Sequence, residues 1–196
     1  RYMRKKILFL AGMMACCSLA GAQEISKTWV ADKGNGTYQN PVLHADYSDP
    51  DVCAAGDDFY MTASSFNCIP GIPILHSNDL VNWSLVNCAL PIQEPEEFFD
   101  KAQHGKGVWA PAIRFHNGEF YIYWGDPDYG IYMIKAKDPK GRWSKPVLVK
   151  AGKGMIDPTP LWDEDGKVYL VHAYAGSRSG VNSIVVICEL NAEGTE

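Results

Sequence analysis

The sequence contains the stretch Asp46-Tyr47-Ser48-Asp49-Pro50-Asp51-Val52, which places three aspartates around one proline. A tight turn at Gly56 and the aromatic segment Phe59-Tyr60-Met61 follow directly. Glycine and aspartate supply the backbone conformations of a short turn, and aromatic residues favour strands. The stretch therefore predicts an aspartate–proline corner that leads into a β-hairpin.

The corner, the turn and the aromatic strand return twice further along the chain. The later corners are Ala110-Pro111 and Asp157-Pro158, and their turns are Asn117-Gly118 and Asp165-Gly166. From the corner proline to the strand tyrosine the chain advances 10, 10 and 11 residues. The pairs counted are Pro50 to Tyr60, Pro111 to Tyr121 and Pro158 to Tyr169. The chain therefore holds three units of one design.

Each unit is expected to consist of short strands separated by turn residues, because helical periodicity is almost absent. Trp83 and Trp143 fall in the expected last strand of the first two units and are assigned to packing. A further edge or closing strand is expected at residues 37–43. The strands expected in the units are residues 49–53, 58–64, 72–77 and 79–86, then 110–115, 119–124, 130–136 and 138–149, then 157–162, 167–172 and 183–190.

A four-stranded unit that repeats every ~40–60 residues is typical of a β-propeller blade. Propellers close with about four to eight blades, whereas three units would leave the ring open and its last sheet edge unpaired. We therefore expect an all-β propeller in which residues 37–196 are the N-terminal part of a longer domain, truncated at its C-terminus. Residues 23–36 are expected to form an irregular leader.

The first residues are expected to form a signal peptide, residues 1–22. Arg4-Lys5-Lys6 is a basic segment, residues 7–19 are apolar, and Ala20-Gly21-Ala22 is a small-residue cleavage site. Cleavage after Ala22 predicts a secreted or periplasmic protein without a membrane span, because the apolar segment is too short to cross a bilayer well.

Two alternatives concern the same segment. It could instead form an N-terminal anchor helix. A lipoprotein cysteine at Cys16 or Cys17 is disfavoured, because Met13-Met14-Ala15 matches the usual lipoprotein pattern poorly.

Removal of residues 1–22 takes away four basic residues and no acidic residue, so the net charge of −5 becomes about −9. Nucleic acids and anionic membranes bind basic surfaces, so neither is expected as a partner. Neutral sugars are compatible with this charge. A hydrophobic content of 46% is sufficient for a packed core.

Four cysteines follow the expected signal peptide: Cys53, Cys68, Cys88 and Cys188. Four cysteines are few for a chain of this length, and two of them lie within apolar strands. We therefore expect buried free thiols, with a Cys68–Cys88 disulfide as the alternative in an exported protein. No cysteine or histidine spacing matches a zinc site, and no metal site is predicted.

The first and third corners carry a carboxylate, whereas the second carries Ala110. The innermost strand of a propeller blade lines the central channel, so Asp49 and Asp157 are expected to face each other in one pocket. Glycoside hydrolysis uses two carboxyl groups, one of which can act as general base on water. The alternative for these two residues is that an aspartate before proline caps amides of its own turn. Asp51, which follows Pro50, is expected to bond locally within the turn.

Several segments in order along the chain also match a known family. They are Asn40-Pro41-Val42-Leu43, Ser48-Asp49-Pro50-Asp51-Val52, Gly56-Asp57-Asp58-Phe59-Tyr60, Pro70-Gly71-Ile72-Pro73-Ile74-Leu75-His76-Ser77-Asn78-Asp79-Leu80-Val81-Asn82-Trp83, Gly107-Val108-Trp109-Ala110-Pro111 and Ile156-Asp157-Pro158. Together they resemble glycoside hydrolase family 43, the β-xylosidase and α-L-arabinofuranosidase type, over nearly all of residues 37–190.

The resemblance implies a five-bladed β-propeller, of which about three blades are present here. It implies an inverting exo-glycosidase that releases xylose or arabinose from xylan, arabinoxylan or arabinan. Asp49 is then the general base, and Asp157 tunes the pKa of the general acid and orients the sugar. The general acid is implied to be a glutamate in a later Glu-Gly-Pro-like corner. This chain has no such corner, so the general acid is expected to be absent and the fragment alone inactive.

The resemblance also places Trp109 in the wall of the sugar subsite, where an indole face packs on sugar C–H groups. Phe66 is a weaker candidate for the same wall, and the alternative for Trp109 is a core position. His76 and His172 are expected to be hydrogen-bonded structural residues rather than metal ligands. No cofactor is required; some relatives hold a calcium ion in the channel, and the motifs neither require nor exclude one.

A non-catalytic carbohydrate-binding propeller is the second hypothesis. The presence of both Asp49 and Asp157 favours the enzyme, with a pentose-containing oligosaccharide or polysaccharide as its partner. A Glu-Gly-Pro-like corner ~40–60 residues downstream would distinguish the two hypotheses. The choice between xylose and arabinose is not decided by these residues.

Overall fold

The structure is a computed structural model that describes residues 28–196. Residues 31–196 form one compact unit, which contains all the strands described here. The expected signal peptide, residues 1–22, lies outside the described residues. No helix among the described residues is long and apolar enough to cross a membrane.

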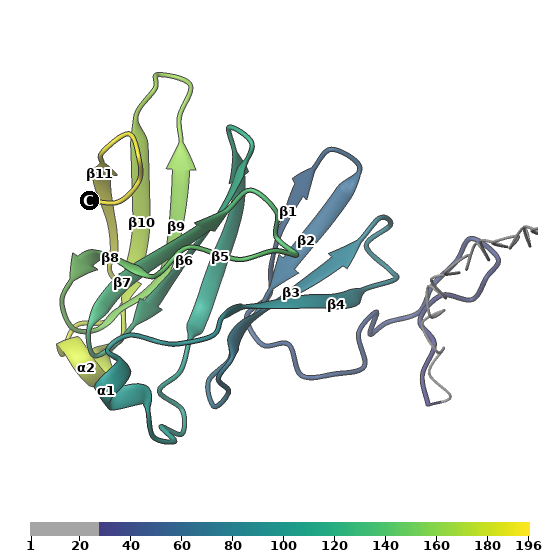
Figure 1. The fold of residues 1–196 in the computed structure, drawn as a ribbon, viewed down its shortest axis with the longest axis horizontal. Helices are drawn as coiled ribbons and strands as arrows, with labels where there is room; N and C mark the ends of the chain where they lie inside the picture. The colour runs from purple at the N-terminus through teal and green to yellow at the C-terminus, as the bar shows by residue number, and fades with distance from the viewer. Residues whose placement is uncertain (1–27) are drawn as a thin grey trace, which may run out of the picture. The chain divides into compact units, whose positions relative to one another are not determined.

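The unit is built from three antiparallel sheets, each in chain order (Figure 1). The first contains β1 (Asp51–Ala55), β2 (Asp58–Thr62), β3 (Gly71–Ser77) and β4 (Ser84–Leu90). The second contains β5 (Trp109–His116), β6 (Glu119–Asp126), β7 (Gly130–Ala136) and β8 (Val147–Ala151). The third contains β9 (Met155–Trp162), β10 (Val168–Tyr174) and β11 (Val185–Leu190). Two single-turn helices, α1 (Glu96–Phe99) and α2 (Gly176–Ser179), lie in the connections.

This arrangement confirms the all-β prediction and the three repeated units. Among the first strands of the three sheets, β5 lies beside both β1 and β9. The first two sheets have the expected four strands, whereas the third has three within residues 28–196. The predicted Asn-Gly hairpin joins β5 to β6, where Asn117 and Gly118 both have the positive φ values that a tight hairpin turn requires.

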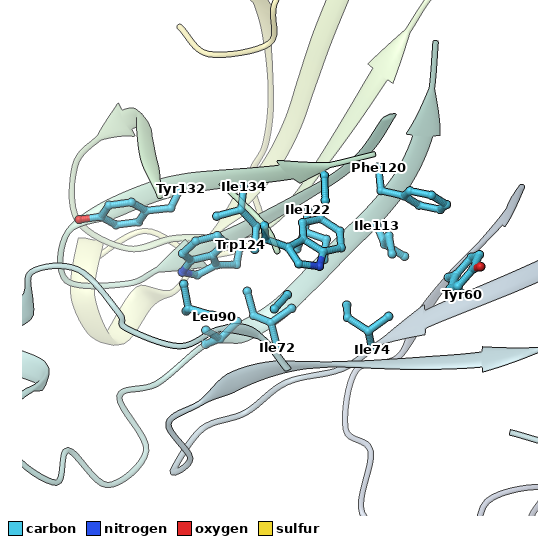
Figure 2. Packing of buried hydrophobic residues seen from close by; sticks show 14 residues of the cluster. Tyr60, Ile72, Ile74, Leu90, Ile113, Phe120, Ile122, Trp124, Tyr132 and Ile134 are labelled. Atoms are coloured by element: carbon cyan, nitrogen blue, oxygen red, sulfur yellow. The ribbon is translucent and has the colours of Figure 1, made fainter. Parts of the chain in front are cut away.

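The core lies in two layers, one on each side of the second sheet. Phe120, Ile122 and Trp124 of β6 point toward the first sheet, as Figure 2 shows, whereas Tyr121 and Tyr123 between them point toward the third. The alternation follows from the two-residue period of a strand. Each fully buried large side chain contributes about 1.5–3 kcal/mol, so the central sheet is held firmly on both faces.

Residues 37–43 do not form the expected strand. Tyr38 makes one isolated bridge to Asp32 and is otherwise exposed. The loop between them contains Gly34 and Gly36, both with positive φ, and Pro41 has no N–H to extend a ladder.

The repeated tryptophans precede the last strands instead of lying within them. The indole N–H of Trp83 donates to the carbonyl of Leu80 at 3.0 Å, and that of Trp143 donates to the carbonyl of Pro139 at 3.2 Å. Each tryptophan therefore stabilises the turn that precedes its strand through a hydrogen bond. Trp143 is buried in the core between the first two sheets, as its assignment to packing predicts.

All four described cysteines are free thiols. Cys53 packs against the core, and burial raises its pKa to about 12. The expectation of burial is wrong for Cys68, which is exposed because it lies in the loop between β2 and β3. The alternative Cys68–Cys88 disulfide is not formed.

Candidate active site

The three corner residues share one unusual backbone conformation. Asp49, Ala110 and Asp157 have φ values of 51°, 35° and 54°, and each precedes a proline. Residues with a side chain seldom adopt this left-handed region, which costs roughly 1–2 kcal/mol. Its presence at all three positions confirms that these corners are equivalent, including the one that carries alanine.

Two of the corners are β-bulges. Between Trp109 and Ala112, β5 places two residues opposite one residue of β6. Between Ile156 and Thr159, β9 does the same opposite β10. A bulge interrupts the alternation of side chains and turns one of them in a new direction. Asp157 lies in the second bulge, so its side chain is released from the regular pattern of the sheet.

The carboxylate of Asp49 is held through one of its two oxygens. The hydroxyl of Ser48 donates to Oδ2 at 2.9 Å, and the hydroxyl of Ser64 donates to the same oxygen at 2.7 Å. Ser64 also accepts the backbone N–H of Ala110 at 2.8 Å. Two consecutive hydrogen bonds through Ser64 therefore join the first corner to the second.

Asp157 differs from Asp49 in that no residue of the described chain donates a hydrogen bond to its carboxylate. Desolvation raises its pKa, and the negative charge of Asp49 raises it further. The two carboxyl groups are thus close enough to interact electrostatically, as the repeat alignment predicted.

The aromatic candidates lie together beside the second corner. The rings of Phe66 and Trp109 meet edge to face with centroids 6.1 Å apart. Trp109 is half-buried, which excludes the alternative of a core position, and its indole N–H donates to the carbonyl of Gly105 at 2.9 Å.

A short ladder between the loops holds these rings in place. The N–H of Ser65 donates to the carbonyl of Val108 at 3.0 Å, and the N–H of Gly107 donates to the carbonyl of Phe66 at 2.9 Å. A Cβ at Gly107 would lie only 2.3 Å from the Ser65 carbonyl oxygen, so this approach requires glycine.

Asp51 does not bond within its own turn, contrary to the expectation from sequence. Its Oδ2 accepts the N–H of Ile113 at 2.7 Å and forms an ion pair with Arg114. Both partners lie on β5, 62 and 63 residues away. Asp51 therefore links the first two sheets, because the inner strands pack side by side and leave those donors opposite it.

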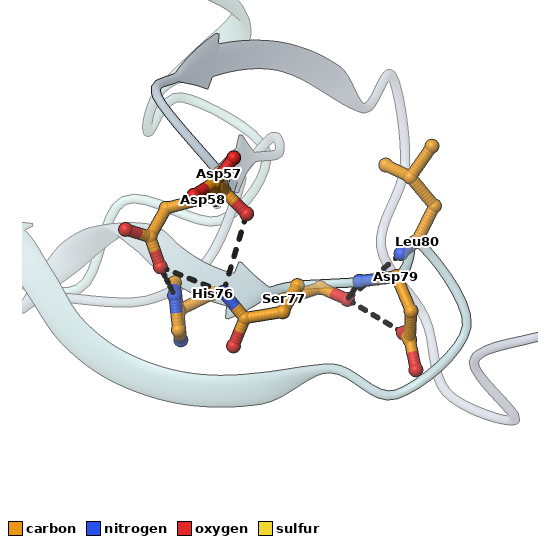
Figure 3. Close-up of polar contacts among 7 residues, drawn as sticks. Asp57, Asp58, His76, Ser77, Asp79 and Leu80 are labelled. Atoms are coloured by element: carbon orange, nitrogen blue, oxygen red, sulfur yellow. Dashed lines mark hydrogen bonds and ion pairs between the residues drawn. The ribbon is translucent and has the colours of Figure 1, made fainter.

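Both histidines have hydrogen-bond partners, as expected from the sequence. His76 Nε2 lies 2.5 Å from Asp58 Oδ1, the contact shown in Figure 3. His172 is fully buried on β10, and its Nδ1 lies 3.1 Å from the carbonyl of Ala173. Within residues 28–196, no three His, Cys, Asp or Glu side chains group together as metal ligands.

Sequence reasoning missed Ser48 and Ser64 as residues of the site. Ser48 directly precedes Asp49, which is the only signal that could have suggested it. Ser64 lies 15 residues after Asp49, and the register of the β1–β2 hairpin, in which Asp51 pairs with Thr62, places it opposite that aspartate. Counting outward from the turn at Gly56 could therefore have suggested Ser64, whereas its bond to Ala110 depends on how the first two sheets pack.

Comparison with known proteins matches the sequence of this chain to a family. A model of the glycosyl hydrolases family 43 matches residues 38–196. The beta-xylosidase of Formosa agariphila is 35% identical over 189 residues, covering 89% of this chain and 32% of the relative. The non-reducing end alpha-L-arabinofuranosidase of Bacteroides ovatus is 38% identical over 139 residues, covering 69% of this chain and 26% of the relative.

Comparison with solved structures points to the same family. A solved family 43 protein from Bacillus licheniformis superposes with a TM-score of 0.66 at 33% identity, covering 81% of this chain and 31% of that protein. The fold of these neighbours is a five-bladed β-propeller, and the three sheets correspond to three of its blades. The chain spans about a third of the length of these relatives or less. By its sequence match and by its fold, the chain belongs to the glycosyl hydrolases family 43.

Proposed function

We propose that this chain forms part of the catalytic propeller of an inverting exo-glycosidase, which releases xylose or arabinose from xylan, arabinoxylan or arabinan. The observation that carries the proposal is the corner pair Asp49 and Asp157. Both residues have the same strained backbone on different sheets, and the charge of one raises the pKa of the other. Strain and a coupled carboxyl pair both cost folding free energy, and such features cluster at functional sites.

Asp49 is the proposed general base. In an inverting hydrolysis, the base takes a proton from water while the water oxygen bonds to the anomeric carbon. The glycosidic bond breaks as a general acid protonates the leaving oxygen, so the anomeric configuration inverts. We assign the general acid to no residue within 28–196.

Asp157 is the proposed modulator of the acid and the residue that orients the sugar. Its carboxylate has no hydrogen-bond donor within residues 28–196, so it is available to sugar hydroxyls or to a neighbouring carboxyl group. A negative charge near a carboxylic acid raises the pKa of that acid, which is what a general acid requires near neutral pH.

Trp109 and Phe66 are the proposed sugar-binding wall. Their edge-to-face contact forms an apolar corner next to Ala110, the corner residue without a charge. A pentose presents C–H groups that pack against aromatic faces. The names of both relatives support pentoses as substrates, one a beta-xylosidase and the other an alpha-L-arabinofuranosidase.

The test uses the protein that carries this chain at its full genomic length, assayed with aryl β-xyloside and aryl α-L-arabinofuranoside. Asp49→Ala should lower kcat by about 10²–10⁴-fold, the typical contribution of a general base, while pentose binding by calorimetry persists. Asp163→Ala, at an exposed turn between β9 and β10, is the control and should turn over normally. Proton NMR of the first product should show inversion.

Three results would contradict this proposal. Retained turnover in Asp49→Ala would remove the base assignment, and retention of configuration would remove the inverting mechanism. Pentose binding without hydrolysis by the unaltered protein would favour a non-catalytic binding propeller.

Export is a separate part of the proposal. We propose that residues 1–22 direct secretion or entry to the periplasm, and N-terminal sequencing of the exported protein should then begin at Gln23. Hydrolysis by carboxyl groups and water requires no cofactor, so chelators should leave turnover unchanged.

A further inference from the structure

The hydroxyl of Ser64 stands between two corners of the site. It donates to Asp49 Oδ2 at 2.7 Å and accepts the backbone N–H of Ala110 at 2.8 Å. A serine hydroxyl has one hydrogen to donate, and the accepted N–H fixes the oxygen that carries it. The orientation of the Asp49 carboxylate is therefore coupled to the backbone of the neighbouring sheet.

The two oxygens of Asp49 differ in their surroundings. Both donors to this carboxylate, Ser48 and Ser64, bond to Oδ2. Oδ1 receives no hydrogen bond from the residues that the structure describes. An oxygen that already accepts two hydrogen bonds is the poorer proton acceptor, because those bonds favour its charged form. Oδ1 is thus the oxygen left to take a proton.

We infer that Ser64 is a positioning residue for hydrolysis, which holds Asp49 through Oδ2 so that Oδ1 faces the attacking water. This inference rests on the proposed function. In the step concerned, the water oxygen bonds to the anomeric carbon and its proton passes to Oδ1. The glycosidic bond breaks, and its oxygen takes a proton from the carboxyl group that serves as general acid.

The local structure explains why a serine suits this position. The N–H of Ser64 donates to the carbonyl of Ser48 at 2.9 Å, so the two serines flank Asp49 from paired segments. The neighbouring Ser65–Val108 and Phe66–Gly107 contacts fix the same segment against the second sheet. Ser64 is therefore held on both sides before substrate arrives, which is the preorganisation that a general base needs.

The chain offers a matched control for deletion of this hydroxyl. Ser77 donates to the carboxylate of Asp79 at 3.0 Å and accepts the N–H of Leu80 at 2.9 Å, as Figure 3 shows. The pattern is similar, although the hydroxyl of Ser77 also accepts the N–H of Asp79 at 3.1 Å. It lies at the end of β3 and involves neither corner aspartate, so Ser77→Ala removes bonds of the same kind without touching the site.

The experiment measures kcat and KM on aryl glycosides for the full-length protein and its variants. Ser64→Ala should lower kcat by about 10- to 100-fold, since a small misplacement of a catalytic group has effects of this size, while KM stays within about twofold. Ser64→Thr keeps the hydroxyl and should retain kcat within about threefold of the unaltered protein. Ser77→Ala should leave kcat unchanged.

A double-variant cycle separates positioning from a general effect on folding. If Ser64 acts through Asp49, Ser64→Ala should cause no further loss of kcat in an Asp49→Asn background. A further loss there, an unchanged kcat in Ser64→Ala alone, or a Ser64→Thr variant as slow as Ser64→Ala would each overturn the inference. If Ser64→Ala does not fold, Ser48→Ala, which removes the other donor to Oδ2, must itself lower kcat.

The same measurements distinguish the two proposals. An unaltered protein that hydrolyses neither glycoside contradicts the proposed function. An active protein whose Ser64→Ala variant is equally active contradicts only the positioning role.

Discussion

Asp126, at the end of β6, carries a buried carboxyl group, and we expect Asp126→Asn to stabilise the protein above about pH 6. Its side chain is 2% exposed. Oδ1 accepts the N–H groups of Asp128 at 2.9 Å and Tyr129 at 3.2 Å. Oδ2 is buried without a partner in the described chain; the nearby amide of Gln93 lowers the pKa of Asp126 but does not reach hydrogen-bond geometry.

The size of the effect follows from the pKa. Burial raises the pKa of Asp126 from 3.8 to about 6, although the hydrogen bonds from the N–H groups of Asp128 and Tyr129 act to lower that pKa. Between these values the unfolded chain ionises this carboxyl group and the folded protein keeps its proton, so the stability of the fold decreases as pH rises. At 1.36 kcal/mol per pH unit, the ionised group costs the fold about 3 kcal/mol above pH 6. Below about pH 4 the cost is absent.

Asparagine keeps an oxygen for the Asp128 and Tyr129 amides but does not ionise. The free energy of unfolding should be measured from urea titrations at about pH 4 and about pH 8. From about pH 4 to about pH 8, the free energy of unfolding of Asp126→Asn should increase by about 3 kcal/mol relative to that of the unaltered protein. Asp163→Asn, at an exposed aspartate that bonds to the next N–H, is the control and should show no such growth. A difference independent of pH would refute the burial argument.

Two further predictions concern the corner region. Asp49→Asn should lower the pKa of Asp157, because the negative charge of Asp49 helps to raise that pKa. NMR titration of the carboxyl carbon of Asp157 measures the pKa, and an unchanged value would mean that burial alone accounts for the shift. Asp51→Ala should lower the free energy of unfolding by about 1–2 kcal/mol in urea titrations, because it removes charge-assisted bonds to Ile113 and Arg114 at a half-exposed site. A smaller loss in Asp51→Asn would show how much of this stability comes from the charge.

Local patterns predicted the corners and most strands of the three sheets, although the strand expected at residues 37–43 does not form. Asn117-Gly118 predicts its hairpin because few other residue pairs adopt two positive φ values. The corner alignment of Asp49, Ala110 and Asp157 was available from residue counting alone, and all three positions have the same φ region. Such features depend on a few adjacent residues, which is why sequence predicts them.

Predictions failed where the partner was distant in sequence. Asp51 was expected to bond within its turn, yet its partners lie on β5, 62 and 63 residues away. Cys68 was expected to be buried like Cys53, but it lies in a loop whose exposure depends on how the loop packs. Neither outcome is encoded in the neighbouring residues.

Strand period, turn residues and proline act locally, so the amino-acid sequence predicts a set of β-sheet units with two aspartate–proline corners. The contacts between sheets depend instead on the tertiary structure. The N–H of Ala110 reaches the hydroxyl of Ser64, 46 residues away, because the first two sheets pack with the Ala110 corner beside the end of β2. Hydrogen bonds require contact within about 3 Å, and only the packing of whole sheets sets such distances between residues far apart in the chain.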